Sequence, residues 1–198
     1  NTDGISIDEW ESKKQLSVYG LKMPDGRLVN KNQVKEAAEE LGCPVVIKIV
    51  SNKIQHKTEM GAVTVNINSP KEAVKAAEEM VQKVSASHPN LDTNNVLVEK
   101  MSKKPVVELL IGIKREQGFG FALVIGSGGT MVELSQDTTT LLLPTNKKAV
   151  EQALKKLKIA KVLEGFRGQA SGDIESTVEA IMAVAKYANA KADSLVEL

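Results

Sequence analysis

The sequence is short of aromatic residues and has almost no excess of either charge. Phenylalanine, tyrosine and tryptophan together make up 3% of the 198 residues. The chain therefore lacks the stacking platforms on which single-stranded nucleic acids bind. The 26 Lys and Arg residues are balanced by 25 Asp and Glu residues, for a formal net charge of +1. This balance excludes a general polyanion-binding surface, so no nucleic-acid partner is expected.

The sequence also has a single cysteine and no long apolar run. Cys43 has no second cysteine with which to form an internal disulfide, and it lies in a Gly-Cys-Pro turn. This usage favours a reducing, cytoplasmic setting. No apolar run approaches about 18 residues, so no membrane-spanning helix and no membrane partner are predicted. No signal peptide is visible.

The most informative stretch present is VVIKIVSNKIQHKTEMGAV, residues 45–63. A lysine inside a Val/Ile strand, Lys48, needs an anionic partner or a path to solvent, because an unpaired buried charge is too costly. A phosphate would serve as that partner. His56, one of two histidines, has Lys53 and Lys57 nearby to stabilise a phosphoryl group on its ring. The alternative is that Lys48 reaches solvent and His56 is an ordinary exposed loop residue.

The hydrophobic pattern predicts an α+β chain of two small lobes. We place the lobes at residues 22–95 and 96–198, preceded by an N-terminal helix within residues 1–21. Expected helices cover residues 7–20, 29–41, 71–86, 147–157 and 174–188, and expected strands cover residues 45–50, 62–67, 96–101, 106–113 and 122–125. The first two strands are expected to pair antiparallel. The last residues, 194–198, look like the start of a further strand.

Three other segments carry groups that suit a nucleotide. The GSGG segment, Gly126 to Gly129, has the composition of a phosphate-binding loop, although no Walker A lysine follows and a tight turn explains it equally well. Glu99 and Glu108 lie on two strands that together offer an edge for a base; alternatively they are polar-face strand residues. Arg167, among glycines, suits bidentate phosphate binding or a plain surface turn.

Several motifs, in order along nearly the whole chain, carry a family resemblance. They are YGLKMP, GCPVVIKIVS, HKTEMGAV, VLVEKM, VELLIG, FGFALVIGSGGTMVE and LEGFRG. The chain resembles the ATP-grasp domain of the NDP-forming acyl-CoA synthetases, the β-subunit type of ADP-forming acetate–CoA ligase. It is distantly similar to the succinyl-CoA synthetase β subunit. The resemblance implies one ATP-grasp domain over residues 1–198, with nucleotide between its lobes.

The resemblance also implies roles for the residues that match these motifs. Lys48 matches the lysine that reaches the nucleotide phosphates. Glu99, Lys100 and Met101 match the adenine hinge, and Glu108 matches the acidic residue on the following strand.

The histidine loop and the glycine loop are matched as well. His56 matches the histidine that accepts the phosphoryl group, on a loop that would move between this domain and a partner. Gly126, Gly128 and Gly129 match the family's glycine loop. Glu133, Asp137 and Arg167 match other recurrent polar positions, and phosphate binding is the role expected of Arg167. The metal ligands are not identified, because the metal-binding motif begins only at Glu197.

The activity implied is reversible formation of acyl-CoA from an acid, ATP and CoA, with ADP and phosphate released. ATP/ADP and Mg²⁺ are the implied cofactors. The implied partner is a CoA-binding ligase subunit or fused domain, which would handle CoA and a small carboxylic acid. Two alternatives stay open: a nucleotide-sensing domain attached to an acyltransferase, and a carboxylate–amine ligase of the wider ATP-grasp group.

The sequence departs from the family pattern at three places. Asn52 stands where proline is usual, which leaves the loop less constrained. Ala62 replaces a glycine, so close backbone approach to phosphate there is in question. Phe121 replaces a proline.

Overall fold

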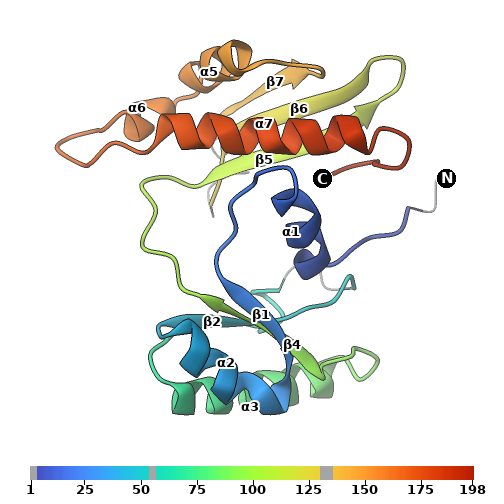
Figure 1. Cartoon of the computed structure of the whole chain (residues 1–198), viewed down its shortest axis with the longest axis vertical. Helices are drawn as coiled ribbons and strands as arrows, with labels where there is room; N and C mark the ends of the chain where they lie inside the picture. The colour runs from blue at the N-terminus through green and yellow to red at the C-terminus, as the bar shows by residue number, and fades with distance from the viewer. Residues whose placement is uncertain (1–3, 54–56, 130–135) are drawn as a thin grey trace. The chain divides into compact units, whose positions relative to one another are not determined.

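The computed structural model describes residues 4–53, 57–129 and 136–198 and divides the chain into two α+β units. Unit 1 comprises Asn1–Gln15 and Met23–Lys103, and unit 2 comprises Leu16–Lys22 and Lys104–Leu198. The α+β class is as predicted (Figure 1). The predicted lobe boundary after residue 95 is not where the chain divides, because strand β4 (Asn95–Lys100) pairs with two strands of unit 1.

Unit 1 contains a four-stranded antiparallel sheet in the order β1-β4-β2-β3. Its other strands are β1 (Gly26–Asn30), β2 (Val45–Ile49) and β3 (Val63–Ile67). The expected antiparallel pairing of β2 with β3 is confirmed. Strand β4 follows β3 in sequence but lies between β1 and β2, so the two central strands of the sheet are β4 and β2.

One face of this sheet is covered by helices α2 (Val34–Leu41) and α3 (Pro70–Ser87) (Figure 1). Side chains alternate between the two faces of a strand. In β2, Val45, Ile47 and Ile49 therefore join the buried core with the helices. Lys48, between two of them, points to the opposite face, where α1 (Glu9–Ser17) lies.

The helix ends in unit 1 correct two predictions. The helix expected over residues 29–41 begins only at Val34, because Gly26–Asn30 forms β1 and Asn30 caps a short 3-10 helix, η1 (Lys31–Gln33). The helix expected over residues 7–20 is limited to α1. Its first turn is capped by Asp8, whose Oδ1 accepts the Glu11 N–H at 2.9 Å.

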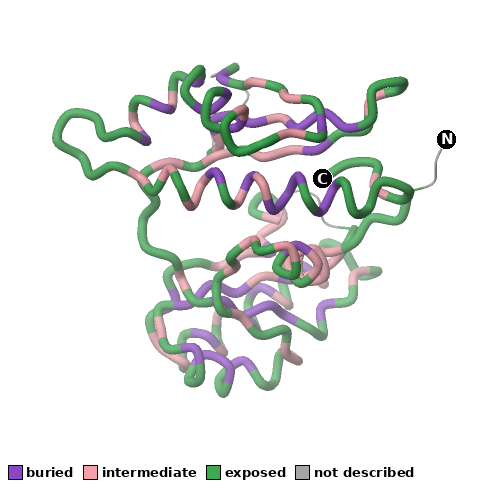
Figure 2. The backbone as a smooth tube through the Cα atoms, turned by 45° about the horizontal axis from the view of Figure 1, so that its top comes forward, coloured by how far each residue is buried: buried purple, intermediate pink, exposed green. Residues whose placement is uncertain are grey.

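Unit 2 contains a three-stranded antiparallel sheet in the order β5-β6-β7. The strands are β5 (Leu109–Glu116), β6 (Gly120–Ser127) and β7 (Thr138–Leu142), and the helices are α5 (Lys147–Lys155), α6 (Ala160–Leu163) and α7 (Ile174–Ala190). Strand β7 was not predicted, because its run of threonines has no apolar alternation. Buried positions recur along β6 and along α7 (Figure 2).

The last residues of the chain join the edge of β5. Ile113 and Leu198 exchange two main-chain hydrogen bonds, at 2.8 and 2.9 Å, and Lys114 forms a β-bridge with Glu197. The strand expected to begin at 194–198 is therefore present as this bridge. The segment between β4 and β5 connects the sheet of unit 1 with the sheet of unit 2.

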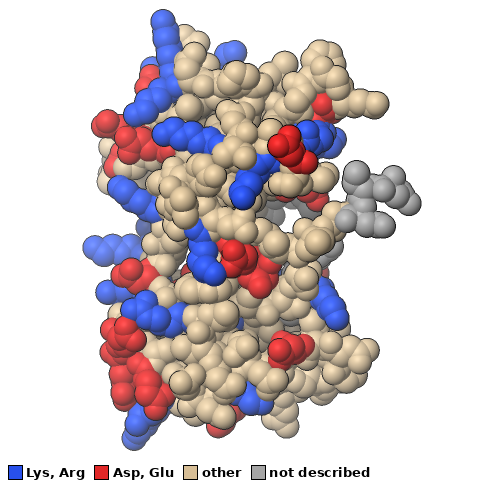
Figure 3. Space-filling model, turned by 45° about the vertical axis from the view of Figure 1, so that its right-hand side comes forward, with Lys and Arg blue, Asp and Glu red and all other residues tan. Residues whose placement is uncertain are grey.

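None of the helices within the described residues has the length and apolar character needed to span a bilayer. Basic and acidic side chains are intermixed on the face shown in Figure 3, in keeping with a net charge near zero.

Candidate functional site

The centre of the candidate site is an ion pair between the two middle strands of the unit 1 sheet. The register of β2 and β4 pairs Val46 with Glu99 and Lys48 with Leu97. Lys48 and Glu99 therefore share the face away from α2 and α3. Lys48 Nζ donates to Glu99 Oε2 at 2.7 Å, and the Glu99 side chain is only 2% exposed.

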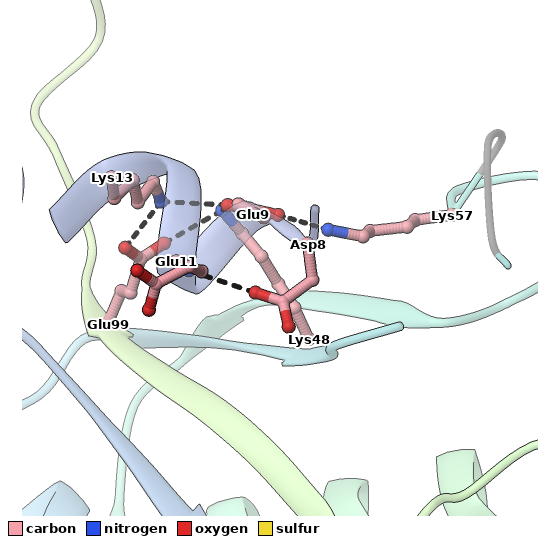
Figure 4. Close-up of polar contacts among 7 residues, drawn as sticks. All are labelled: Asp8, Glu9, Glu11, Lys13, Lys48, Lys57 and Glu99. Atoms are coloured by element: carbon pink, nitrogen blue, oxygen red, sulfur yellow. Dashed lines mark hydrogen bonds and ion pairs between the residues drawn. The ribbon is translucent and has the colours of Figure 1, made fainter. Parts of the chain in front are cut away.

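Helix α1 and the segment after β2 complete this site (Figure 4). Glu9 Oε1 accepts hydrogen bonds from Lys48 Nζ at 2.6 Å and from Lys13 Nζ at 2.7 Å. Lys13 Nζ also donates to Glu99 Oε1 at 2.5 Å, and Lys57 Nζ donates to Glu9 Oε2. We call Glu9, Lys13, Lys48, Lys57 and Glu99 the ionic cluster.

The ionic cluster carries three ammonium groups and two carboxylates, and hence a net charge of +1. Burial alone would raise the pKa of the Glu9 carboxyl. Hydrogen bonds from Lys13, Lys48 and Lys57 together lower it by more than burial raises it, so the pKa falls from 4.5 to about 2. Burial lowers the pKa of Lys48, but its bonds to Glu9 and Glu99 raise it more. Both groups are therefore charged at neutral pH.

Lys48 has anionic partners, but they are the carboxylates of Glu9 and Glu99, and its side chain is 20% exposed. Its binding to a nucleotide phosphate stays a prediction. Glu9 and Lys13 were not predicted as members of the site. Their (i, i+4) spacing indicates one helix face, but nothing in the sequence shows which strand that face meets. His56 lies outside the described residues, and its role stays a prediction. Lys57, the next residue in sequence, belongs to the ionic cluster.

The expected adenine hinge has its main-chain donors already in use. The Lys100 N–H donates to the Asp25 carbonyl at 2.8 Å, and the Met101 N–H donates to the Pro44 carbonyl at 2.9 Å. Any recognition of a base at this segment must therefore use other groups. The nucleotide-binding roles of Lys100 and Met101 remain predictions.

In unit 2 the structure brings Glu108 together with the glycine loop. The Gly128 N–H donates to the Glu108 carbonyl at 2.7 Å. A Cβ at Gly129 would lie 2.9 Å from Glu108 Oε2, and Gly129 has a positive φ of 81°. The positive φ favours glycine here, whereas the Glu108 carboxylate is the end of a flexible side chain that could move aside.

The other residues suggested for the site lie elsewhere in unit 2 or outside the description. Arg167 is exposed, and its guanidinium lies 5.2 Å from the centre of the Phe166 ring. Glu197 lies near the end of β5 opposite to Glu108. Asp137 is buried and accepts the main-chain N–H groups of Lys158 and Ile159 at 2.7 and 2.9 Å, which gives it a structural role. Glu133 lies outside the described residues.

The departures from the family pattern have structural explanations at two positions. Ala62 is fully buried, and its N–H donates to the Lys57 carbonyl at 2.7 Å, so it supports the segment that carries Lys57. Phe121 is buried under the Arg115 guanidinium, which lies 4.6 Å from the ring centre. Asn52 donates to the Ser6 carbonyl at 3.3 Å.

The two antiparallel sheets, one of which carries a lysine paired across strands, fit the ATP-grasp class of protein. The family model for the ATP-grasp domain matches residues 3–197, and the chain belongs to this family. Within it, the chain is 33% identical over 191 residues to the β subunit of ADP-forming acetate–CoA ligase II of Pyrococcus furiosus, covering 96% of this chain and 80% of the relative.

Two further relatives point the same way. The ADP-forming acetate–CoA ligase of Methanocaldococcus jannaschii is 37% identical over 185 residues; the match covers 91% of this chain but only 26% of that ligase. The chain thus spans about a quarter of that relative's length. Among solved structures, acetyl-coenzyme A synthetase 1 of Ca. Korarchaeum cryptofilum has a TM-score of 0.90 at 33% identity, covering 96% of this chain and 83% of that one.

Proposed function

We propose that this chain is the ATP-grasp component of an ADP-forming acyl-CoA synthetase and transfers a phosphoryl group between ATP and His56. The observation that carries the proposal is the position of Lys57. Lys57 directly follows His56 in sequence, and it contacts the same Glu9 carboxylate as Lys48, the expected phosphate-binding lysine. The solved relative from Ca. Korarchaeum cryptofilum is described with a phosphohistidine segment pointing towards its nucleotide-binding site, which supports this assignment.

In phosphoryl transfer the protein mainly positions the reacting groups and stabilises negative charge. In the forward step a neutral imidazole nitrogen of His56 forms a bond to the γ-phosphorus, and the bond from that phosphorus to the β,γ-bridging oxygen breaks. ADP leaves with the electron pair, and the imidazole loses its N–H proton to solvent. Negative charge spreads over the transferred oxygens, and ammonium groups such as Lys48 and Lys57 stabilise it electrostatically.

Magnesium is the expected counter-ion of the nucleotide. The described part of the chain contains no group of three or more His, Cys, Asp or Glu side chains arranged to hold a metal ion. Mg²⁺ at nucleotide sites is usually bound by one or two carboxylates together with the phosphates of the nucleotide, so the ion enters with ATP in this proposal and no separate step is assigned to it. The ion is supplied in the assay as the complex with ATP.

The remaining half-reaction is assigned to a partner. Named relatives include separate β subunits as well as a ligase of which this chain matches about a quarter. A CoA-binding subunit or fused domain would pass the phosphoryl group to a small carboxylic acid and then form the thioester. The partner, the acid and CoA binding are proposals.

The test uses γ-labelled ATP with Mg²⁺ and the two histidines of the chain. We expect acid-labile, base-stable label on the wild-type chain, loss of the label in His56→Ala, and full label in His88→Ala. His88 is a matched control because it is exposed and its imidazole ring contacts only the neighbouring Ser87 hydroxyl among the contacts described. Label that persists in His56→Ala would reject His56 as the acceptor. Tight nucleotide binding with no label in the wild type would favour the nucleotide-sensing alternative.

A further inference from the structure

We propose that Glu9 is a built-in competitor for phosphate: its carboxylate occupies, among Lys13, Lys48 and Lys57, the place that a phosphoryl group takes when nucleotide binds. Binding then requires Glu9 to leave these lysines. The inference rests on the proposed nucleotide site and adds to it a residue that lowers phosphate affinity. It concerns unit 1 alone, because all members of the ionic cluster belong to that unit.

The two carboxylates of the ionic cluster are not equivalent. Glu99 is 2% exposed and comes from a central strand, so it is a fixed counter-ion of Lys13 and Lys48. Glu9 is 23% exposed and comes from the first turn of α1, which leaves it free to turn towards solvent. Lys57 contacts Glu9 but makes no described bond to Glu99. Glu9 is therefore the exchangeable partner.

The contacts of Glu9 resemble those of a bound phosphate. Its two oxygens accept hydrogen bonds from three ammonium groups, carried by a helix, a strand and a loop. A terminal phosphoryl group offers three oxygens and about two negative charges to the same donors. It can therefore satisfy all three lysines more completely than a carboxylate does.

Charge makes the two anions mutually exclusive. With Glu9 in place the ionic cluster has a net charge of +1; without it, the charge is +2. A phosphoryl group beside Glu9 would place like charges a few ångströms apart in a partly buried site, where repulsion is weakly screened. Removing the Glu9 charge should therefore strengthen phosphate binding, whereas removing a residue that merely orients the lysines should weaken it.

The experiment measures binding of inorganic tripolyphosphate by calorimetry to the full chain. We expect Glu9→Gln, which keeps the side-chain shape, to bind about fivefold more tightly than wild type, with a steeper dependence on salt. Glu11→Gln should bind like the wild type. Glu11 lies on the same helix but is exposed and pairs with Lys14. Glu9→Asp keeps the charge on a shorter arm and should give an intermediate affinity; it also serves if Glu9→Gln does not fold.

Equal or weaker binding by folded Glu9→Gln would overturn the inference, as would no tripolyphosphate binding by any of these proteins. Tighter binding by Glu9→Gln together with no labelled histidine would uphold the competitor role while rejecting the proposed phosphoryl transfer. The two hypotheses are therefore tested separately.

Discussion

Lys48 Nζ and Glu99 Oε2 lie 2.7 Å apart across neighbouring strands, and the carboxylate is almost completely buried. Glu99 has a second partner, Lys13, on its other oxygen. A buried charge with two hydrogen-bonded partners is tolerated, but loss of one member leaves the others without compensation. We therefore expect the stability of the protein and its affinity for ATP to depend on this pair.

Neutralising Glu99 should destabilise the protein. Glu99→Gln leaves the ammonium groups of Lys13 and Lys48 with Glu9 as their only described carboxylate partner, at a cost of about 3 kcal/mol. The matched control is Glu40→Gln, which removes a surface pair with Arg27 in which Glu40 is 60% exposed; its cost should be less than about 1 kcal/mol. Urea unfolding followed by circular dichroism measures both. Equal losses for the two variants would contradict a structural role for the buried pair.

Removing the Lys48 charge should weaken nucleotide binding. Lys48→Met keeps the length of the side chain and deletes the ammonium group, and we expect affinity for ATP to fall at least about tenfold. Lys35→Met is the control, because Lys35 is exposed on α2 and pairs only with Glu39 among the ion pairs described. Calorimetry with ATP distinguishes them. Unchanged affinity in Lys48→Met would remove this lysine from the site.

The local part of this site was predictable from the sequence, whereas its long-range part was not. Lys48 was identified because a charge in an apolar strand needs a partner, and that argument uses only neighbouring residues. Glu9 lies 39 positions away, and its approach depends on where α1 packs, which no periodicity encodes. The predicted helix start at Val29 is wrong for the same reason, since the helix begins at Val34. Residues 26–30 become a strand through pairing with β4, far along the chain.

The ionic cluster should make stability depend on acid pH. Burial raises the pKa of Glu9, but its three lysine partners bring it down from 4.5 to about 2. Because the folded pKa is the lower one, the stabilisation is present above pH 4.5 and is lost as the pH falls towards 2. We expect a loss of about 1–2 kcal/mol, reduced by partial exposure of the carboxylate. Urea unfolding between pH 4.5 and 2 should show a smaller loss of unfolding free energy for Glu9→Gln than for the wild type. The same pH dependence in both proteins would contradict the pairing of Glu9 with the lysines.

Asp137 should matter for stability and not for phosphoryl transfer. Its buried carboxylate accepts the main-chain N–H groups of Lys158 and Ile159, just before α6 begins. Asp137→Ala should cost about 1–3 kcal/mol, because it leaves two main-chain N–H groups without their acceptor. Histidine labelling by γ-labelled ATP should stay at the wild-type level at a temperature where the variant is folded. Loss of label from a folded variant would return Asp137 to the list of candidate site residues.

Gly128 in the glycine loop and Gly118 between β5 and β6 should respond differently to substitution by alanine. At Gly128 a Cβ would lie 3.0 Å from the Leu109 carbonyl carbon and 3.1 Å from that of Glu108, so main chain must move to admit it. At Gly118 a Cβ would meet nothing within 4 Å, and only the positive φ of 83° opposes it. Gly118→Ala should therefore cost about 1 kcal/mol, whereas Gly128→Ala should cost about 2–3 kcal/mol through the clash. Gly128 and Glu108 are both expected nucleotide-binding residues, so a shift of the main chain between them should weaken ATP binding as well, which calorimetry on both variants would detect. Equal effects on stability and affinity would mean that the close approach of β5 to the glycine loop is not needed for either.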